Sequence, residues 1–497
     1  MPELNFSLFS TLFFLVDLAI RVGLSFRVIM RKRSHGVTLA WLVVILLFPF
    51  IGVILYLLFG ENRISERRTK RMQHSFKYYQ HWLQSLQDRA PVQWQHLGAE
   101  CLPLHNLALH HTGLPAMAGN NLVLLNSSEQ FLNSLIGDIE QARSTCHLQF
   151  YIWQEGGMVD DVMAAICRAS DRGVACRILL DSIGSREFLV SDSAAKLQAR
   201  GVRIREALPA GLIKALFARV DIRNHRKIVV IDGQTAYTGS QNMADPSCFK
   251  AGAGVGQWVD VMLKLRGPVV ESLAGTFIND WYLESSSRQI SLAVTSHAVE
   301  SFRKAADVHQ LEPEGDVAVQ LVPSGPDFTT EAIHSLLLTT IYAARKELIL
   351  TTPYFVPDDA LLAALKSASL RGVQVILIIP AQNDSKLADY ASRARFGELL
   401  QAGVHIKLFF GGLLHSKTIT IDGDFALFGS VNFDMRSFWL NFETTLVIYD
   451  RPACTQLREL QQEYISSSRD LDKEDYQNRS TLEQFKENAV LLMGPLL

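Results

Sequence analysis

The most constraining feature of the sequence is one pattern of six fixed residues that occurs twice with identical spacing. The pattern reads His-x-Lys-x4-Asp-x6-Gly-Ser-x-Asn. Its two copies are His225, Lys227, Asp232, Gly239, Ser240 and Asn242, and His415, Lys417, Asp422, Gly429, Ser430 and Asn432. Two such matches do not arise by chance in a chain of 497 residues. The repetition therefore predicts a fold that is built twice and a function that needs both copies.

The side chains of the pattern are those of phosphate chemistry. An imidazole can attack a phosphorus atom or transfer a proton, and a lysine ammonium is a compact positive charge. Small hydroxyl and amide groups can donate hydrogen bonds to phosphoryl oxygens. A single His-x-Lys string would be an ordinary surface feature, but the duplication favours catalysis. The residues expected to hold the phosphoryl oxygens are Lys227, Asn242, Lys417 and Asn432, with Ser240 and Ser430 in support.

The correspondence between the halves extends upstream of the pattern. Residues 160–174 match residues 358–373, and each stretch reads as a helix that ends at a glycine and leads into a buried strand. An apolar strand precedes each helix, at 147–153 and at 347–355. Alternating strands and helices predict the α/β class, here a duplicated α/β sandwich with helices on both faces of the sheet.

Each copy of the pattern is expected to begin on a strand. Residues 227–231 and 417–421 are β-rich runs that Asp-Gly closes, which is a turn signal. On such a strand each histidine faces the same side as the lysine two residues later. Asp232 and Asp422 are candidate catalytic residues as members of the pattern. Each lies an odd number of residues after its histidine, so its side chain faces the opposite side of the strand and is poorly placed to orient the imidazole.

A catalytic histidine usually needs a carboxylate or carbonyl on its second ring nitrogen. Two acids that enter apolar strands downstream are the candidates: Asp260, which lies 35 residues after His225, and Glu443, which lies 28 residues after His415. We expect each acid to orient the histidine of its own half. The alternative is an ordinary carboxylate at a strand edge.

The first 62 residues are expected to form a transmembrane hairpin. Residues 37–59 carry no charge and are long enough to cross a bilayer, with a kink at Pro49. Residues 6–24 are a weaker span, because Asp17 and Arg21 interrupt them and need to pair on one helix face. The alternative for 6–24 is a re-entrant or signal-like segment. Basic residues flank both ends of the second span, so the positive-inside rule hardly decides the orientation of the hairpin in the membrane.

Composition narrows the remaining choices. The 48 basic and 50 acidic residues argue against a nucleic-acid binder held by bulk charge. Six scattered cysteines without C-x-x-C spacing are typical of reduced thiols, which favours a cytoplasmic catalytic part. No cluster of acidic residues of the divalent-metal type accompanies the pattern, and we expect no metal and no cofactor.

The paired strings resemble the phospholipase D superfamily over about residues 115–470, and the whole layout resembles bacterial cardiolipin synthases. The resemblance implies a phosphatidyltransferase of the bacterial inner membrane, crossing it more than once, that converts two phosphatidylglycerols to cardiolipin and glycerol. It also implies that His225 is the nucleophile and His415 the acid and base, and it supports Asp260 and Glu443 as acidic partners. Anionic membrane lipid is the expected partner and nucleic acid is not. The oligomeric state stays open.

Three alternatives remain beside this function: a membrane-anchored hydrolytic phospholipase D, another phosphatidyltransferase, and a non-catalytic lipid-binding protein. The last needs a degraded pattern, and neither copy is degraded. The expected boundaries are 1–62 for the hairpin, 63–114 for a basic juxtamembrane segment and linker, 115–300 for the first repeat, 301–316 for a linker, and 317–497 for the second repeat.

The first half holds an insertion at about residues 207–220. Leu208, Leu212, Leu216 and Val220 recur there at helical spacing. One interpretation is a short helix buried between the halves. The other is an interfacial helix beside the site, whose basic residues reach towards anionic headgroups.

Overall fold

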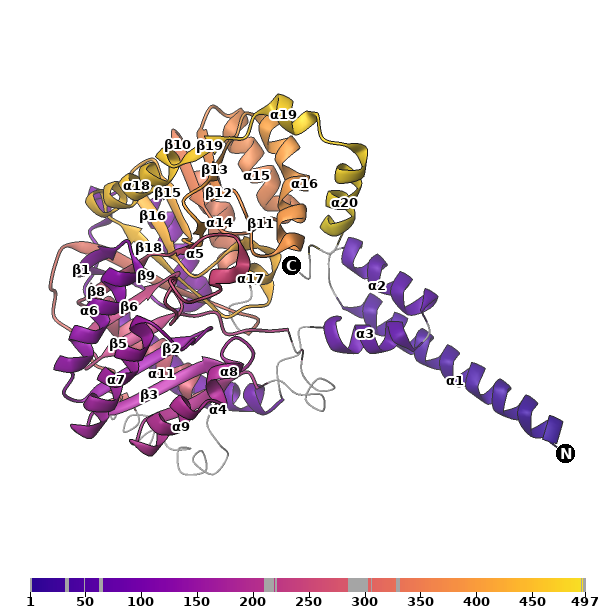
Figure 1. Cartoon of the computed structure of the whole chain (residues 1–497), viewed down its shortest axis with the longest axis horizontal. Coiled ribbons are helices and arrows are strands. Elements are labelled where there is room, and N and C mark those ends of the chain that lie inside the picture. Colours follow the sequence, from indigo (N-terminus) through magenta and orange to yellow (C-terminus); the bar gives the residue numbers. More distant parts are fainter. Residues whose placement is uncertain are drawn as a thin grey trace. The chain divides into compact units, whose positions relative to one another are not determined.

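The computed structural model describes residues 2–31, 35–48, 50–61, 66–209, 219, 221–284, 303–304, 306–327, 331–492 and 494. The chain divides into two compact units. One consists of Met1–Lys70 and Ala210–Ile222, and the other of Arg71–Pro209 and Arg223–Leu497 (Figure 1). In the insertion expected to be helical, residues 210–218 and 220 lie outside the described residues, so that helix stays a prediction.

The first unit contains three helices in its described part, α1 (Pro2–Met30), α2 (His35–Leu47) and α3 (Ile51–Phe59) (Figure 1). Val28, Ile45 and Tyr56 form their buried contact. The expected ion pair within α1 is present, with Arg21 2.7 Å from Asp17.

Residues 37–59, predicted to form one helix kinked at Pro49, instead contain two separate helices. The segment forms two helices because Phe50 adopts a left-handed backbone with φ of 61°, and a proline at 49 removes a backbone donor and disfavours helical geometry in the residue before it. Helices of 13 and 9 residues are too short for a bilayer core of about 30 Å. In the part of the chain that the structure describes, no helix combines the length and the apolar character that crossing a membrane requires. The two expected spans are therefore not found there.

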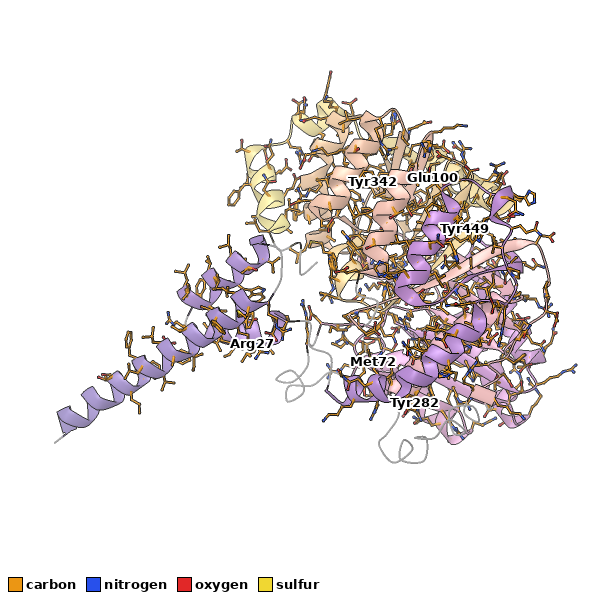
Figure 2. The ribbon with its side chains drawn as sticks, turned by 180° about the vertical axis from the view of Figure 1, so that it is seen from behind. Arg27, Met72, Glu100, Tyr282, Tyr342 and Tyr449 are labelled. Atoms are coloured by element: carbon orange, nitrogen blue, oxygen red, sulfur yellow. The ribbon has the colours of Figure 1, made fainter. Side chains whose placement is uncertain are left out.

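The expected linker at 63–114 is mostly helical. It contains α4 (Glu66–Leu86), a single 3-10 turn (Trp94–His96) and α5 (Cys101–Thr112). Trp94 packs edge-on against Tyr449 with ring centroids 5.2 Å apart, in the region where Figure 2 labels Tyr449 and Glu100. Ala108 and Leu104 of α5 are buried in the core of the second repeat. From Arg71 onwards this stretch belongs to the second unit, and α5 contributes to its core.

Fifteen strands of the described chain form one sheet. The first repeat contributes β1 (Ala116–Leu125), β2 (Thr145–Phe150), β3 (Ala175–Asp181), β4 (Arg203–Ala207), β5 (Ile228–Ile231), β6 (Thr235–Gly239) and β8 (Met262–Arg266). The second contributes β9 (Val317–Ser324), β10 (Glu347–Thr351), β12 (Gln374–Pro380), β13 (His405–Phe409), β15 (Thr418–Ile421), β16 (Phe425–Gly429), β18 (Glu443–Tyr449) and β19 (Ser468–Asp470).

The strand order shows the duplication directly. From the centre outwards the first repeat runs β1-β8-β6-β5-β2-β3-β4, and the second runs β9-β18-β16-β15-β10-β12-β13 with β19 added at the edge. The repeats join through the antiparallel pair β1 and β9. The outer strands β2, β3 and β4 of the first repeat are parallel to one another, and so are the corresponding strands β10, β12 and β13 of the second. The α/β class and the duplication are confirmed, and both repeats belong to a single sheet.

Helices cover both faces of this sheet, because side chains alternate along each strand. In β5, Val229 packs towards α6 (Ser128–Gln141) and α7 (Met158–Asp171), whereas Ile228 and Val230 pack in the cluster that contains α11 (Val269–Leu283). In the second repeat, α14 (Ala332–Ala343) and α15 (Asp359–Leu370) correspond to α6 and α7, α16 (Lys386–Ala402) corresponds to α9 (Asp192–Ala199), and α18 (Arg451–Ser466) lies on the α11 side. Figure 1 shows these layers.

Candidate active site

The two histidines are anchored by the backbone of the opposite repeat. His225 donates its N–H to the carbonyl of Phe442 at 2.8 Å, and His415 donates its N–H to the carbonyl of Val259, also at 2.8 Å. A short parallel pair of strands, β14 (Leu413–Leu414) and β7 (Trp258–Val259), supports the second contact. Since Phe442 and Val259 each immediately precede a candidate acid, the anchoring brings each histidine beside the acid of the other repeat.

The acids indeed contact the histidines crosswise. Nδ1 of His225 lies 3.0 Å from Oε2 of Glu443, and Nδ1 of His415 lies 2.7 Å from Oδ1 of Asp260. The expected pairing within each half is wrong. Strand parity indicates the face on which a carboxylate lies, but not which repeat supplies it. Because Nδ1 is engaged in both rings, Nε2 is the nitrogen that remains for chemistry.

The two serines of the pattern bind the acids. Oγ of Ser240 donates to Oδ1 of Asp260 at 2.6 Å, and Oγ of Ser430 donates to Oε2 of Glu443 at 2.5 Å. Both serines are fully buried. The sequence predicted that these serines bind a phosphoryl oxygen directly, but their hydroxyl groups are buried against the acids instead. Each serine instead fixes the carboxylate that orients a histidine.

Both lysines are buried next to the histidines. Nζ of Lys227 donates to the carbonyl of His225 at 2.8 Å, and Nζ of Lys417 donates to the carbonyl of His415. Burial is the main cause that lowers the pKa of Lys227 to about 8 and that of Lys417 to about 7, although the nearby carboxylates raise both. The Nζ atoms of the two lysines thus contact the backbone of the two histidines and lie near the buried acids.

The histidines open on one cavity of about 360 Å³ within the catalytic unit. Asn242 and Asn432 line it, one from each copy of the pattern. The Oδ1 atom of Asn242 accepts from the N–H of Ile152 at 3.2 Å, which orients its amide, and Oδ1 of Asn432 has no hydrogen-bond partner within the described chain. Both asparagines are therefore part of the wall that a ligand in the cavity would contact.

Burial also controls the protonation of the site. It lowers the pKa of His415 to about 4 and lowers that of His225, with the neighbouring acids opposing the shift only in part. Burial alone would raise the pKa of Asp260, but the contacts with His415, Lys417 and Ser240 bring it down to about 2. The pKa of Glu443 is lowered in the same way. At neutral pH the site therefore holds two neutral imidazoles, each beside an ionised carboxylate.

The aspartates of the pattern lie at the far ends of the motif strands. Asp232, with φ of 53°, accepts the backbone N–H groups of Arg143, Ser144 and Thr145 at 2.8–3.0 Å. Asp422, with φ of 55°, accepts the corresponding groups of Arg345, Lys346 and Glu347. Through these hydrogen bonds, each aspartate links its own turn to the start of a neighbouring strand, β2 for Asp232 and β10 for Asp422. This geometry does not support the prediction that the two aspartates are catalytic, and neither lines the cavity of the histidines.

Several cavity residues lie outside the pattern and were not singled out from the sequence. They are Tyr151, Arg223, Lys250, Trp258, Tyr354, Asp384 and Arg436. Arg223 stands two residues before a pattern histidine, so strand parity could have indicated it. Asp384 follows the buried strand β12, and the carboxyl ends of parallel strands are where ligands usually bind. The remaining residues carry no local signal.

Comparisons with known proteins agree with this arrangement. The model of the family described as "Cardiolipin synthase, PLD-like domain" matches residues 135–281 and 337–465. Cardiolipin synthase A of Yersinia pseudotuberculosis is 42% identical over 475 residues, which cover 96% of each chain, and cardiolipin synthase A of Yersinia pestis matches equally well. The chain belongs to the cardiolipin synthase family of the phospholipase D superfamily. The expected phosphatidyltransferase is thereby confirmed.

The family match covers both repeats and their acids. Its two segments contain His225 with Asp260, and His415 with Glu443. A second model, described as "Phospholipase_D-nuclease N-terminal", matches residues 19–61. The crystal structure of a phosphatidylserine synthase from Haemophilus influenzae has the same fold, with a TM-score of 0.58, 17% identity, and coverage of 79% of this chain and all of that one.

Proposed function

We propose that this member of the cardiolipin synthase family converts two phosphatidylglycerols to cardiolipin and glycerol through a phosphohistidine. The observation that carries the proposal is the crosswise pair of histidine–carboxylate contacts on one cavity. Two imidazoles with fixed Nδ1 atoms suit a two-step exchange, in which one forms the covalent bond and the other moves the proton. The identity of 42% to cardiolipin synthases supports the choice of substrate.

In the first step, Nε2 of His225 attacks the phosphorus of one phosphatidylglycerol. A phosphorus–nitrogen bond forms, the bond from phosphorus to the glycerol oxygen breaks, and His415 gives its proton to that oxygen. Glu443 accepts the hydrogen bond from Nδ1 of His225 and stabilises the positive charge that the ring acquires. Lys227 and Lys417 supply positive charge close to the phosphoryl oxygens, and the amides of Asn242 and Asn432 donate to them.

In the second step, a glycerol hydroxyl of another phosphatidylglycerol attacks the same phosphorus. His415 removes the hydroxyl proton, a phosphorus–oxygen bond forms, and His225 departs as a neutral ring. Two inversions retain the configuration at phosphorus. His415 must carry a proton in the first step although burial lowers its pKa to about 4. The negative phosphodiester raises the pKa of this imidazole when it enters, because an adjacent anion favours the charged ring.

The same proposal places the enzyme at a bacterial inner membrane, with its catalytic unit on the cytoplasmic side. The helical unit supports this, because large apolar side chains of α1, α2 and α3 are exposed. Phe14, Phe26, Leu47 and Ile51 are each more than 60% exposed. Such a concentration of exposed apolar surface suits contact with lipid far better than contact with water. Free cysteines support the cytoplasmic side.

The test is one assay with the purified full chain and phosphatidylglycerol labelled in the headgroup glycerol and in the acyl chains. Cardiolipin and free glycerol should appear in equal amounts, with little phosphatidic acid. Phosphatidic acid as the main product would instead indicate a hydrolytic phospholipase D. Binding of the lipid without any product, under conditions that support related synthases, would leave only a lipid-binding role.

A further inference from the structure

The two walls of the catalytic cavity differ although the repeats that form them correspond. The wall beside His225 carries Tyr151, Arg223 and Arg436. The wall beside His415 carries Trp258, whose ring centroid lies 4.5 Å from that of His415. Beyond it are Lys250, Tyr354 and Asp384. One wall is thus rich in arginine, whereas the other carries the ion pair of Lys250 with Asp384.

Asp384 is held in place by two neighbours in the same wall. Its Oδ2 atom lies 2.9 Å from Nζ of Lys250, and its Oδ1 atom accepts a hydrogen bond of 2.7 Å from the hydroxyl of Tyr354. The carboxylate side chain is only 10% exposed. A carboxylate offers about four acceptor positions, so these two contacts leave capacity for a ligand. The ammonium of Lys250 balances its charge.

Trp258 adds an unused donor to this wall. The residue is buried, and its Nε1–H group has no hydrogen-bond partner among the described residues. A buried indole N–H usually finds a partner, because leaving it unpaired costs free energy. Lys250 lies over the same indole ring at 5.1 Å. The wall therefore presents the carboxylate of Asp384 as an acceptor and the ammonium of Lys250 as a donor, together with a tyrosine oxygen that can still accept.

We propose that Asp384 and Tyr354, with Lys250 beside them, form a polyol subsite that holds the free hydroxyls of a glycerol headgroup. The proposal rests on the proposed function, in which His415 exchanges its proton with the glycerol oxygen. The remaining hydroxyls of that glycerol then lie on the His415 side of the cavity. A hydroxyl both donates and accepts, which suits a carboxylate beside an ammonium and a phenol. Because Lys250 already neutralises Asp384, a neutral polyol fits better than a cationic headgroup.

The subsite gives the enzyme a means to prefer an alcohol over water. In the first step it holds the departing glycerol, and in the second it holds the headgroup of the incoming phosphatidylglycerol. Both are the same chemical group, so one subsite serves both. Sites that hydrogen-bond a substrate hydroxyl discriminate strongly against an analogue that lacks it, since the polar groups of the site are then left unpaired.

The experiment uses the reverse reaction of the full chain, in which cardiolipin donates a phosphatidyl group to a free alcohol. Glycerol and propan-1-ol are compared as acceptors, because they share the attacking primary hydroxyl and differ in the other two. We expect the native enzyme to favour glycerol by about tenfold or more in kcat/KM. Asp384→Ala should reduce this preference to near unity, and Tyr354→Phe should reduce it in part.

Asp389→Ala is the matched control. Asp389 lies in the first turn of α16, near Asp384, and pairs with Arg393 on the helix surface outside the cavity. This variant should keep the native preference. Asp384→Asn, which conserves the volume of the side chain, distinguishes recognition from misfolding if Asp384→Ala has a lower melting temperature.

The outcomes separate the subsite from the proposed function. If either Asp384 variant loses rate equally with glycerol and propan-1-ol, so that the ratio is unchanged, Asp384 acts on the chemistry or the fold and the subsite is refuted. If Asp389→Ala changes the ratio as much as Asp384→Ala does, the effect is one of general charge and the subsite is again refuted. If the native chain transfers to no alcohol, the proposed function itself fails.

Discussion

The two copies of the pattern have the same backbone setting but different surroundings. Each histidine is anchored by the opposite repeat and each is oriented by a serine-bound acid. His225, however, faces Glu443 with arginines nearby, whereas His415 faces Asp260 and has a pKa lowered to about 4. The pattern therefore determines where the two imidazoles lie. Residues outside the pattern make their chemistry unequal.

The crosswise contacts also distinguish this duplication from a pair of independent domains. Each histidine needs a carboxylate that the other repeat supplies. Neither repeat contains a histidine with its partner acid. The active site is consequently a property of the joined sheet, and the two repeats have to be correctly docked before either imidazole has a fixed tautomer.

The largest expected effect comes from removing each histidine. His225→Ala should abolish turnover and the covalent phosphatidyl-enzyme together. His415→Ala should also abolish turnover but only slow formation of the adduct, and a substrate with a good leaving group should partly restore this step, because such a group needs no proton. Labelled lipid bound to denatured protein measures the adduct. An adduct on residue 415 would reverse the assigned roles.

The acids should have the next largest effect, and they test the crosswise pairing. Asp260→Asn and Glu443→Gln should each lower kcat by about two to four orders of magnitude while the fold stays intact. Glu443→Gln should prevent formation of the adduct on His225. Asp260→Asn should resemble His415→Ala and spare adduct formation with a good leaving group. The opposite assignment of the two phenotypes would mean that the acids serve the histidines of their own halves.

The buried histidine predicts a loss of stability in acid. The pKa of His415 falls from 6.5 to about 4 on folding, so the folded state binds this proton less tightly than the unfolded state does. This difference in pKa contributes roughly 3 kcal/mol to the free energy of unfolding above about pH 6.5, and the contribution is lost as the pH falls towards 4. Thermal unfolding between pH 7 and 4.5 measures it. His415→Gln should flatten this dependence, and an unchanged slope would contradict the assignment.

The serines should have a smaller effect on activity than the acids they hold. Ser240→Ala and Ser430→Ala each remove one hydrogen bond to a buried carboxylate, which should lower kcat by about tenfold. Ser240→Ala should act through His415 and Ser430→Ala through His225. The double variant Ser430→Ala with Glu443→Gln should be no slower than Glu443→Gln alone. Full additivity would show that Ser430 acts directly on the phosphate.

Much of this arrangement follows from the sequence, because strand alternation is a local property. Parity alone separates the side of His225 and Lys227 from that of Asp232. It also directs the search for orienting acids to Asp260 and Glu443. Parity cannot show that Glu443 meets His225, because that contact depends on how two repeats dock. The pairing of β14 with β7 joins residues more than 150 positions apart, and no local signal reports it.

Other features of the site and of the fold could not be predicted from the sequence, for different physical reasons. A serine in a phosphate-like string can bind a phosphate or a carboxylate, and only the packed structure shows that Ser240 meets Asp260. Asp384 and Lys250 become neighbours through the tertiary fold alone. Pro49 was expected to kink one helix, yet the chain reverses to a left-handed backbone at Phe50 and a second helix begins. How far a proline disrupts a helix depends on neighbours that the local sequence does not specify.

The smallest effect on activity is expected from the aspartates that close each copy of the pattern. Asp232→Asn and Asp422→Asn should change kcat/KM by less than about threefold but lower the free energy of unfolding by about 1–3 kcal/mol, because each removes a charged acceptor from three backbone N–H groups. Asp232 also accepts from the hydroxyl of Ser144 at 3.0 Å, so its variant should be the less stable of the two. Denaturant unfolding and steady-state kinetics on the same preparations measure both quantities. A loss of activity comparable to that of Asp260→Asn, without a loss of stability, would return these aspartates to the catalytic machinery and show that the hydrogen bonds to the neighbouring strand are not their main role.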